Sequence, residues 1–397
     1  MAFIGWLLLV GACLGNTALL ISHCNWWYGV PVNRHILTPV RIIHGIMVLV
    51  IPVGWWHYFG WDWTGPANLK LNHLLQDGVG GYFLFCFLIG CIVFPLVTLF
   101  RNLRRAPALL HNHTTTRDIA AELGYRPIGK GKHRWLAHLP MNNIFQVDFS
   151  EKTLALPNLP RALDGLSILQ LTDFHFHGTP DMDFYERVMD ACHAWDPDIL
   201  AVTGDIVDTR KHHSWILPLF RRLRWRQAAW AILGNHDSWY HPEETRRLLG
   251  QLDIDVLGNR WKQVNIRGEP LVVIGNENPW VRPVPDLTNC PKDLFRLCLS
   301  HTPDNIRWAQ KNQINLMLAG HNHGGQVRLP MIGSILVPSN YGRRYDGGTY
   351  QEDPTVLHVC RGLSAQHPLR INCRPEVTKL ILRTGKVDGV TPEKGAI

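Results

Sequence analysis

Five segments of the sequence share one pattern, an apolar run that ends abruptly in residue types able to bind metal ions. The first is 168–172, which leads into Asp173 and His175. Such a run is typical of a buried parallel strand, and the ligands of open α/β sheets gather at the carboxyl ends of their strands. Side chains two residues apart on an extended chain point the same way, so Asp173 and His175 can face one site. The runs at 199–203, 229–233, 297–300 and 316–319 deliver in the same way Asp205, Asp208, Asn235, His236, Asp237, His301, His321 and His323.

A glycine stands just before the first ligand in three of these segments, at Gly204, Gly234 and Gly320. A chain that turns sharply at a strand end often needs the missing Cβ of glycine. We therefore expect tight turns at these three strand ends.

The candidate ligands are too many for a single ion. A carboxylate can bridge two cations, and two divalent ions about 3.5–4 Å apart can hold both the attacking and the leaving oxygen of a displacement at phosphorus. Mixed nitrogen and oxygen ligands without cysteine favour Mn, Fe, Zn, Co or Ni over Ca or a structural thiolate zinc. The sequence therefore predicts two divalent metal ions, without choosing among these elements, held by Asp173, His175, Asp205, Asn235, His301, His321 and His323.

The five segments taken in order resemble the motif series of the calcineurin-like metallophosphoesterases. The resemblance covers residues 156–383 and implies an α/β fold, a sandwich of two mixed sheets flanked by helices. The motifs that carry it are Asp173-x-His175, Gly204-Asp205-x-x-Asp208, Gly234-Asn235-His236-Asp237, His301 and Gly320-His321-x-His323.

The resemblance also implies a role for each residue. Asp205 would bridge the two metals, and His236 would donate a hydrogen bond or proton to the phosphate, with Asp237 orienting it. For Asp208 two roles stay open, a metal ligand through water or, as we favour, an acceptor behind His175 or a backbone amide. One metal would be held by Asp173, His175 and His323, and the other by Asn235, His301 and His321.

Elementary chemistry agrees with these roles. A hydroxide that bridges two cations is a nucleophile at neutral pH, because the metals lower the pKa of bound water from about 15.7 toward about 7. A histidine that binds no metal is the usual proton donor near pH 7, and a carboxylate behind it fixes its tautomer. The expected reaction is hydrolysis of a phosphodiester or pyrophosphate bond.

Three apolar segments come before this region, at 3–22, 42–61 and 78–100. Each approaches the roughly 20 residues that span a bilayer. A cleavable signal peptide is the alternative for the first, but no basic residues precede it. The middle segment contains Pro52 and two histidines, so a re-entrant or interfacial helix is its alternative.

Charge predicts the orientation of these spans. With three spans, Arg34 and Arg41 fall on the same side as the arginines at 101, 104 and 105, and only Lys70 falls opposite. The positive-inside rule then places the catalytic region in the cytoplasm of a multi-pass membrane protein. Nine scattered cysteines without a CxxC pair also favour a reducing compartment.

We expect three regions, a membrane anchor at 1–105, a juxtamembrane connector at 106–155 and a catalytic domain at 156–397. The connector is polar, and His111 and His113 belong to it without a strand to position them. Its basic residues either lie against anionic lipid or are solvated. Late strands at 327–329, 356–360 and 377–382 are expected to complete a second sheet.

The substrate is the least determined feature. Arg343, Arg344 and Arg370 follow the last motif and could bind a phosphate through their guanidinium groups, a solvated basic face being the alternative. The segment 369–377 is similar to a membrane-associated branch that includes bacterial phosphodiesterases and a lipid A pathway pyrophosphatase. His177 and Trp280 could line the pocket or be ordinary loop residues.

Three functions remain open. The first is a membrane-anchored phosphoesterase for a lipid-linked substrate, with a UDP-2,3-diacylglucosamine pyrophosphatase of the lipid A type as its specific form. The second is a non-catalytic metal-binding scaffold, which the filled motif positions disfavour. The third is a nucleic-acid enzyme; the net charge of +8 is compatible with it, but the basic residues are spread over connector and membrane flanks, so no nucleic acid is expected. The sequence does not indicate an oligomeric state.

Overall fold

The computed structural model describes residues 2–32, 34–63, 65–104 and 106–385. The chain divides into two compact units. The helical unit holds the first 104 residues together with the segment Pro338–Arg344, and the catalytic unit holds the rest. Arg105 and residues 386–397, which we assigned to the anchor and the catalytic domain, lie outside the described residues.

The helical unit contains three helices long and apolar enough to cross a membrane, counted over its described residues. The middle one begins earlier than expected and runs as a continuous helix with Pro39 and Pro52 inside it. The third contains one turn of π-helix. The helices are α1 (Ala2–Gly29), α2 (Arg34–Tyr58) and the series α4 (Gly78–Leu88), η1 (Ile89–Val93) and α5 (Phe94–Leu103), with the short α3 (Leu71–Gln76) before it.

Glycines allow α1 to approach the third span closely. A Cβ on Gly15 would lie 1.7 Å from the carbonyl oxygen of Cys86, and one on Gly90 would lie 2.0 Å from the carbonyl oxygen of Gly11. Small residues at such crossings let helix backbones pack in a membrane, where apolar side chains gain little from leaving lipid. Beside this crossing, the Tyr82 hydroxyl donates to Asn16 Oδ1 of α1 at 2.8 Å.

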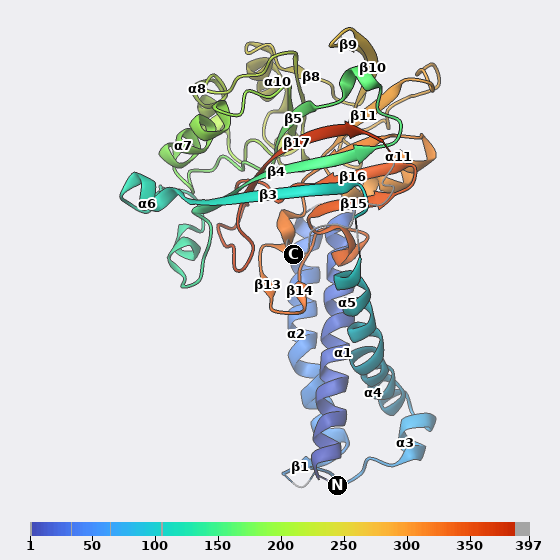
Figure 1. Ribbon diagram of the computed structural model, residues 1–397. Helices are drawn as coiled ribbons and strands as arrows, with labels where there is room; N and C mark the ends of the chain where they lie inside the picture. Colours follow the sequence, from blue (N-terminus) through green and yellow to red (C-terminus); the bar gives the residue numbers. More distant parts are fainter. Residues whose placement is uncertain (1, 33, 64, 105, 386–397) are drawn as a thin grey trace. The chain divides into compact units, whose positions relative to one another are not determined.

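The catalytic unit contains two mixed sheets within residues 106–385. The larger has the order β3-β4-β17-β5-β6-β7-β8, and the smaller has the order β15-β16-β12-β11-β10-β9 (Figure 1). The larger comprises β3 (Leu109–Asp118), β4 (Gln146–Leu156), β17 (Glu376–Thr384), β5 (Leu166–Leu171), β6 (Ile199–Thr203), β7 (Ala228–Ile232) and β8 (Asp255–Val256). The smaller comprises β15 (Gly348–Glu352), β16 (Thr355–Val359), β12 (Leu316–Ala319), β11 (Phe295–Ser300), β10 (Glu269–Asn276) and β9 (Trp261–Ile266).

Two apolar cores explain why the central strands are apolar on both faces. On β5, Leu169 and Leu171 pack with the helices that cover the larger sheet, whereas Leu166 and Ile168 pack between the two sheets. A strand buried on both faces reads as a continuous apolar run. The covering helices are α7 (Met182–His193), α8 (Ile216–Phe220) and α10 (Pro242–Gly250). The two-sheet sandwich flanked by helices is the predicted fold.

The expected connector is not a linker. Its residues form β3 and β4, with α6 (Ile119–Leu123) and η2 (Arg134–His138) between them, and β3 is an edge strand of the larger sheet. Its side chains are mostly exposed, so the strand is held by backbone hydrogen bonds to β4 and needs no apolar run. His111 and His113, which we left without a strand, therefore lie on β3.

The last strands also differ from expectation. Of the three expected strands, only 356–360, as β16, joins the second sheet. β17 inserts into the larger sheet, parallel to β4 and antiparallel to β5. The segment at 327–329 contributes β13 (Arg328–Leu329), which pairs with β14 (Gly333–Ser334) in a small hairpin and joins neither large sheet of the described residues. Apolar runs identify strands but do not specify their neighbours, so the sheet assignment could not follow from them.

Candidate metal centre

The predicted ligands follow the carboxyl ends of strands from both sheets. Asp173 and His175 come after β5, Asp205 after β6, and Asn235 begins α9 (Asn235–Trp239) after β7. From the smaller sheet, His301 follows β11, and His321 and His323 follow β12. β5, β6 and β7 are parallel to one another, as are β11 and β12, so each set of ligands emerges at one sheet edge.

The backbone is strained at most of these positions. Five predicted ligands have a positive φ, a region that side chains other than glycine seldom adopt and that costs about 1–3 kcal/mol when a structure enforces it. Such strain concentrates at functional sites. The five are Asp173, His175, Asp205, His321 and His323, with φ between 48° and 70°.

The three glycines before the ligands serve two purposes. Gly204 has a φ of 95°, as expected for a sharp turn. Gly234 and Gly320 do not have positive φ; instead, a Cβ on Gly234 would lie 2.1 Å from Asp205 Oδ1, and one on Gly320 would lie 2.4 Å from Asp173 Oδ2. These two glycines make room for the ligand carboxylates.

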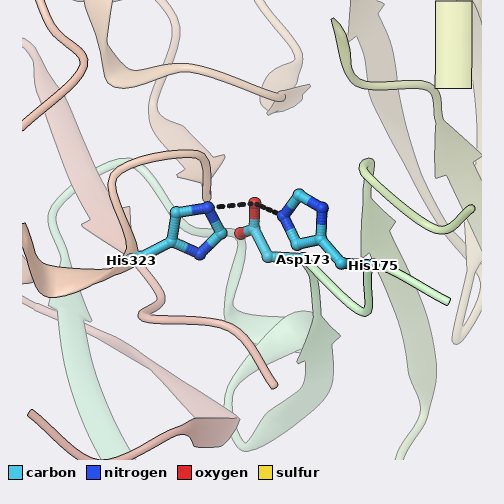
Figure 2. Close-up of side chains that lie close together, drawn as sticks. All are labelled: Asp173, His175 and His323. Carbon is cyan, nitrogen blue, oxygen red and sulfur yellow. Dashed lines mark ion pairs between the residues drawn. The ribbon is translucent and has the colours of Figure 1, made fainter. Parts of the chain in front are cut away.

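One cluster consists of Asp173, His175 and His323, whose ligand atoms lie close enough to hold one ion. Asp173 Oδ1 is 3.9 Å from His175 Nε2 and 3.8 Å from His323 Nε2. Figure 2 shows both imidazole rings turned toward this carboxylate. The structure thus brings together the three side chains that the sequence assigned to the first metal.

A second cluster consists of Asp205, His301 and His321. Asp205 Oδ2 lies 3.3 Å from His301 Nε2, and Asn235 Oδ1 lies 3.1 Å from the same nitrogen. His301 Nδ1 is 2.8 Å from the backbone oxygen of Thr203, which fixes its tautomer and leaves Nε2 to face the cluster. Asn235, His301 and His321, the three residues expected to hold the second metal, are therefore gathered around Asp205, the expected bridge.

Asp205 connects the two clusters. Its Oδ2 lies 3.6 Å from His175 Nε2 of the first and 3.3 Å from His301 Nε2 of the second. The other oxygen, Oδ1, accepts from the backbone N–H of His236 at 2.8 Å, which holds the carboxylate in this orientation. Asp205 Oδ2 therefore lies within 4 Å of a histidine nitrogen from each cluster.

The donor atoms fit a metal site. His175 Nε2 and His321 Nε2 are buried and have no hydrogen-bond partner among the described residues. A buried ring nitrogen without a partner costs about 1–3 kcal/mol, and each of these faces the carboxylate-lined centre. Coordination of a divalent cation would satisfy both nitrogens.

Burial and neighbouring charges shift the pKa values of the ligands, toward the metal-binding form at His321, His323 and Asp205 and away from it at Asp173 and His301. Burial and the neighbouring His301 lower the pKa of His321, and burial and His175 lower the pKa of His323. Burial opposes ionisation of Asp205, but His301 and His236 outweigh it and hold its pKa well below the usual range. Neutral imidazoles and an ionised carboxylate are the forms that bind metal ions.

Asp208, and not Asp237 as expected, is the carboxylate that lies beside the His236 ring. Asp208 Oδ1 is 2.9 Å from His175 Nδ1, as favoured from the sequence, and it also lies 2.8 Å from His236 Nδ1. Asp237, which we expected behind His236, accepts instead from the backbone N–H groups of Ile206 and Val207 and of the glycine before Asn235. The correction has a local cause, because Asp237 lies in the first turn of α9 and caps the backbone there.

His236 is the candidate proton donor. It is 12% exposed, and its ring stands beside that of His175, with centroids 4.6 Å apart. Burial would lower the pKa of His236, but Asp208 and Asp205 outweigh it and raise that pKa to about 10. Nδ1 forms an ion pair with Asp208 when the ring is protonated, so Nε2 is the nitrogen left to donate to a substrate oxygen.

Two tryptophans flank the centre. The Trp280 ring packs on His321 and His301, with centroid distances of 4.7 and 5.6 Å. Trp239 ends α9, is 47% exposed, and has its ring 4.8 Å from that of His236. Trp280 lies in a loop that has no periodic pattern of apolar residues. Nothing in the sequence around it therefore predicted that its ring would pack on the ligand histidines.

Arg370, one of the three arginines proposed for substrate binding, contacts the ligand His323 but does not face a substrate. Arg370 is fully buried and donates to the backbone oxygens of His323, Arg361 and Ser364. It supports the loop that carries His323 and does not present a free guanidinium to a phosphate. Arg343 and Arg344 belong to the helical unit.

His177 is buried, and its Nε2 lies 3.2 Å from the backbone oxygen of Ala365. Its ring is thus engaged with the loop that follows Arg361, and it is not part of either ligand cluster. Of the two roles left open for His177, the structure favours the loop residue.

Comparisons with known proteins match the part of the chain that carries the ligand residues. The family model described as calcineurin-like phosphoesterase matches residues 166–325. The uncharacterized metallophosphoesterase YkuE of Bacillus subtilis is 30% identical over 60% of this chain and 86% of its own length. Phosphodiesterase YaeI of Escherichia coli is 28% identical over 54% of this chain and 81% of its own. A transmembrane protein with metallophosphoesterase domain from Bos taurus is 26% identical over 57% of this chain and 54% of its own.

The family match spans the region from β5 to the turn after His323, and so contains every residue of the two clusters. The similarity to YkuE extends over most of that protein. The ligand geometry and these similarities lead to one conclusion: the chain belongs to the calcineurin-like metallophosphoesterases, which are metal-dependent phosphoester hydrolases.

Proposed function

We propose that this chain is a multi-pass membrane phosphoesterase that uses two divalent cations to hydrolyse a phosphodiester or pyrophosphate bond of a lipid-linked substrate. The observation that carries the dinuclear part is the position of Asp205 Oδ2 between His175 Nε2 and His301 Nε2. The cations would supply Lewis acidity and an activated water. Mn, Fe, Zn, Co and Ni all suit the mixed nitrogen and oxygen donors.

Side chains of this protein perform the other steps of the reaction. Asp205 and Asp173 would supply the negative charge that balances the cations, and the four histidines of the two clusters together with Asn235 would complete the ligand set. His236 donates a proton from Nε2 to the leaving oxygen, while Asp208 holds its Nδ1 side. Burial of these groups excludes water and strengthens their electrostatic effect on the phosphoryl oxygens.

The bond and the substrate class rest on separate arguments. The name phosphodiesterase of the relative YaeI supports action on a diester. The three apolar helices support a lipid-linked substrate, because anchoring raises the effective concentration of the site at the membrane. The excess of arginine at one end of these helices supports a cytoplasmic catalytic unit, and nine free cysteines agree with a reducing compartment.

The test uses full-length protein in detergent, stripped of metal and then resupplied with Mn²⁺. Turnover is measured side by side on bis-p-nitrophenyl phosphate and on UDP-2,3-diacylglucosamine, and bound metal is counted by elemental analysis. Two ions per chain with metal-dependent turnover are expected. His236→Ala should lose turnover and keep its metal, while the matched control His193→Ala, at the end of α7, should keep both.

The outcomes separate the alternatives. Turnover of the lipid nucleotide far above the generic diester would establish a pyrophosphatase of the lipid A type. Turnover of the generic diester alone would keep the mechanism and reject that substrate. Metal binding without turnover of either compound would instead support a scaffold, and a single ion per chain would refute the dinuclear centre.

A further inference from the structure

A small hairpin of the catalytic unit exposes apolar side chains at its tip and flanks. β13 and β14 are joined through residues 330–332 and project from the body of the unit (Figure 1). Leu329 is 42% exposed, Met331 88% and Leu336 55%. Single exposed apolar residues are ordinary, but a cluster on one projecting element marks a contact surface.

A second exposed loop lies beside the hairpin. It carries Trp135, which is 62% exposed, and Met141, which is 75% exposed. Three basic residues precede the tryptophan and are also exposed. They are Lys130, Lys132 and Arg134.

The chain around His367 joins the loop to the hairpin. The His367 ring stacks on that of His133 in the loop, at a centroid distance of 4.7 Å. The His367 backbone oxygen accepts from Gln326 Nε2 at 2.9 Å, two residues before β13. Hairpin and loop are therefore both packed on the segment around His367. Their exposed apolar and basic side chains are here called the docking rim, made of Leu329, Met331, Leu336, Trp135, Met141, Lys130, Lys132 and Arg134.

The hairpin is tied by the chain to the end of a membrane helix. The segment Pro338–Arg344 belongs to the helical unit, and Asn340 Nδ2 donates to the backbone oxygen of Gly29, the last residue of α1. In the same segment, Arg343 donates to Thr98 and its guanidinium lies 4.9 Å from the Phe94 ring centre. Leu336 precedes this segment by two residues, a span of at most roughly 7 Å.

We propose that the docking rim inserts into the interfacial layer of an anionic bilayer. Tryptophan and aliphatic side chains partition into that layer, and adjacent lysine and arginine bind anionic headgroups. The hairpin is connected through the chain to the end of a membrane span, which keeps the rim within reach of the membrane. This favours a lipid surface over a soluble protein as the binding partner of the rim. The docking does not depend on the proposed activity.

Docking would bring the metal centre to the bilayer. His323 lies at the start of η6 (His323–Gly325), which leads into β13 within a few residues. On the other side, the backbone N–H of Gly131 in the basic loop donates to the backbone oxygen of Gly178, three residues after the ligand His175. Both halves of the rim are thus attached to chain segments that carry ligands.

The test is photocrosslinking of the full chain in nanodiscs of phosphatidylcholine with about one quarter phosphatidylglycerol. p-Benzoylphenylalanine replaces Met331 in one variant and Trp135 in another, both at exposed positions that tolerate a large side chain. Leu49, which is 70% exposed on α2, serves as the lipid-contacting control, and Val284, 46% exposed in a loop of the catalytic unit, as the control away from the rim. The readout is the mass of the intact protein after irradiation.

A mass gain of one phospholipid is expected at positions 331, 135 and 49, and none at 284. Replacing Lys130, Lys132 and Arg134 together by alanine should lower the yield at 135 about fivefold or more with phosphatidylglycerol, and little in phosphatidylcholine alone. A lipid adduct at 49 without one at 331 or 135 would overturn the proposal. A gain of a whole chain at 331 would also overturn it, in favour of contact between two copies.

Discussion

Replacing Asp208 by asparagine should weaken metal binding and turnover together, because one carboxylate serves two histidines. Its Oδ1 lies 2.9 Å from Nδ1 of the ligand His175 and 2.8 Å from Nδ1 of the proton donor His236. A hydrogen bond to a charged group contributes about 1.5–3 kcal/mol and one between neutral groups about 0.5–1.5 kcal/mol. The contact with His175 is a hydrogen bond, and that with His236 is an ion pair without hydrogen-bond geometry. The amide loses the charge, so the loss is roughly 1–1.5 kcal/mol at His175, and the ion pair with His236 loses Coulomb attraction of about 1 kcal/mol or more.

A free-energy change of about 1.4 kcal/mol corresponds to a factor of ten in a dissociation constant. Asp208→Asn should therefore bind Mn²⁺ about tenfold more weakly, because His175 is held less firmly. At saturating metal, kcat should fall about tenfold through His236, in the range known for carboxylates that support metal ligands. The assay titrates metal-stripped protein with Mn²⁺ by equilibrium dialysis and measures kcat on bis-p-nitrophenyl phosphate once the metal is saturating.

Two further variants make this prediction specific. Asp164→Asn is the matched control. This carboxylate also pairs with a basic residue, Arg383 at 2.8 Å, but it lies just before the start of β5, at the end of the strand away from the metal ligands. Asp237→Asn should chiefly lower thermal stability, since the carboxylate accepts three backbone N–H groups. If Asp208→Asn changes both quantities less than twofold, or if Asp237→Asn alone reproduces its kcat loss at full metal occupancy, the assignment of Asp208 to His236 is refuted.

Three other predictions follow from single contacts. Asp205→Asn should reduce bound metal from two ions per chain to one or fewer by elemental analysis, because the shared oxygen loses its charge; unchanged metal content would contradict the bridging role. Burial opposes ionisation of Glu376, but the positive charges around it, Arg361 first among them, outweigh burial and lower the pKa of Glu376. The ionised carboxylate therefore stabilises the fold above about pH 4.5, and this stabilisation is lost as the pH falls below that value. Glu376→Gln should cost about 3–5 kcal/mol at pH 7, and the difference from wild type should be about 2 kcal/mol smaller at pH 3, by thermal denaturation in detergent; an equal difference at both pH values would exclude this linkage. Gly15→Ile should lower the melting temperature in detergent by several degrees because α1 packs there against a facing backbone, whereas Gly45→Ile, with open space around it, should not; equal effects would argue against that packing.

Local patterns carried most of the site prediction. An apolar run followed by a ligand type is a feature of a few adjacent residues, and strands that are buried on both faces must read as such runs. The side chains of Asp173, His175 and His323, and those of Asp205, His301 and His321, are gathered as the sequence implied. Their individual roles in binding and catalysis remain predictions for the experiments above.

The sequence could not reveal β3, because an edge strand is held by backbone hydrogen bonds and keeps polar side chains. It could not place β17, because strand pairing depends on backbone geometry between segments far apart in the chain. For the same reason the insertion of Pro338–Arg344 into the helical unit left no signal.

By itself, the sequence determined which residue types the strand ends deliver, the chemistry open to them and the three apolar helices, since each follows from neighbouring residues. The tertiary structure alone decided which carboxylate supports which histidine. Asp208 and Asp237 both lie within a few residues of a ligand, but only Asp208 reaches His175 and His236, while Asp237 is used by the backbone of its own turn. Distances of 3 Å between side chains from different strands are set by the packing of whole sheets, which no local pattern contains.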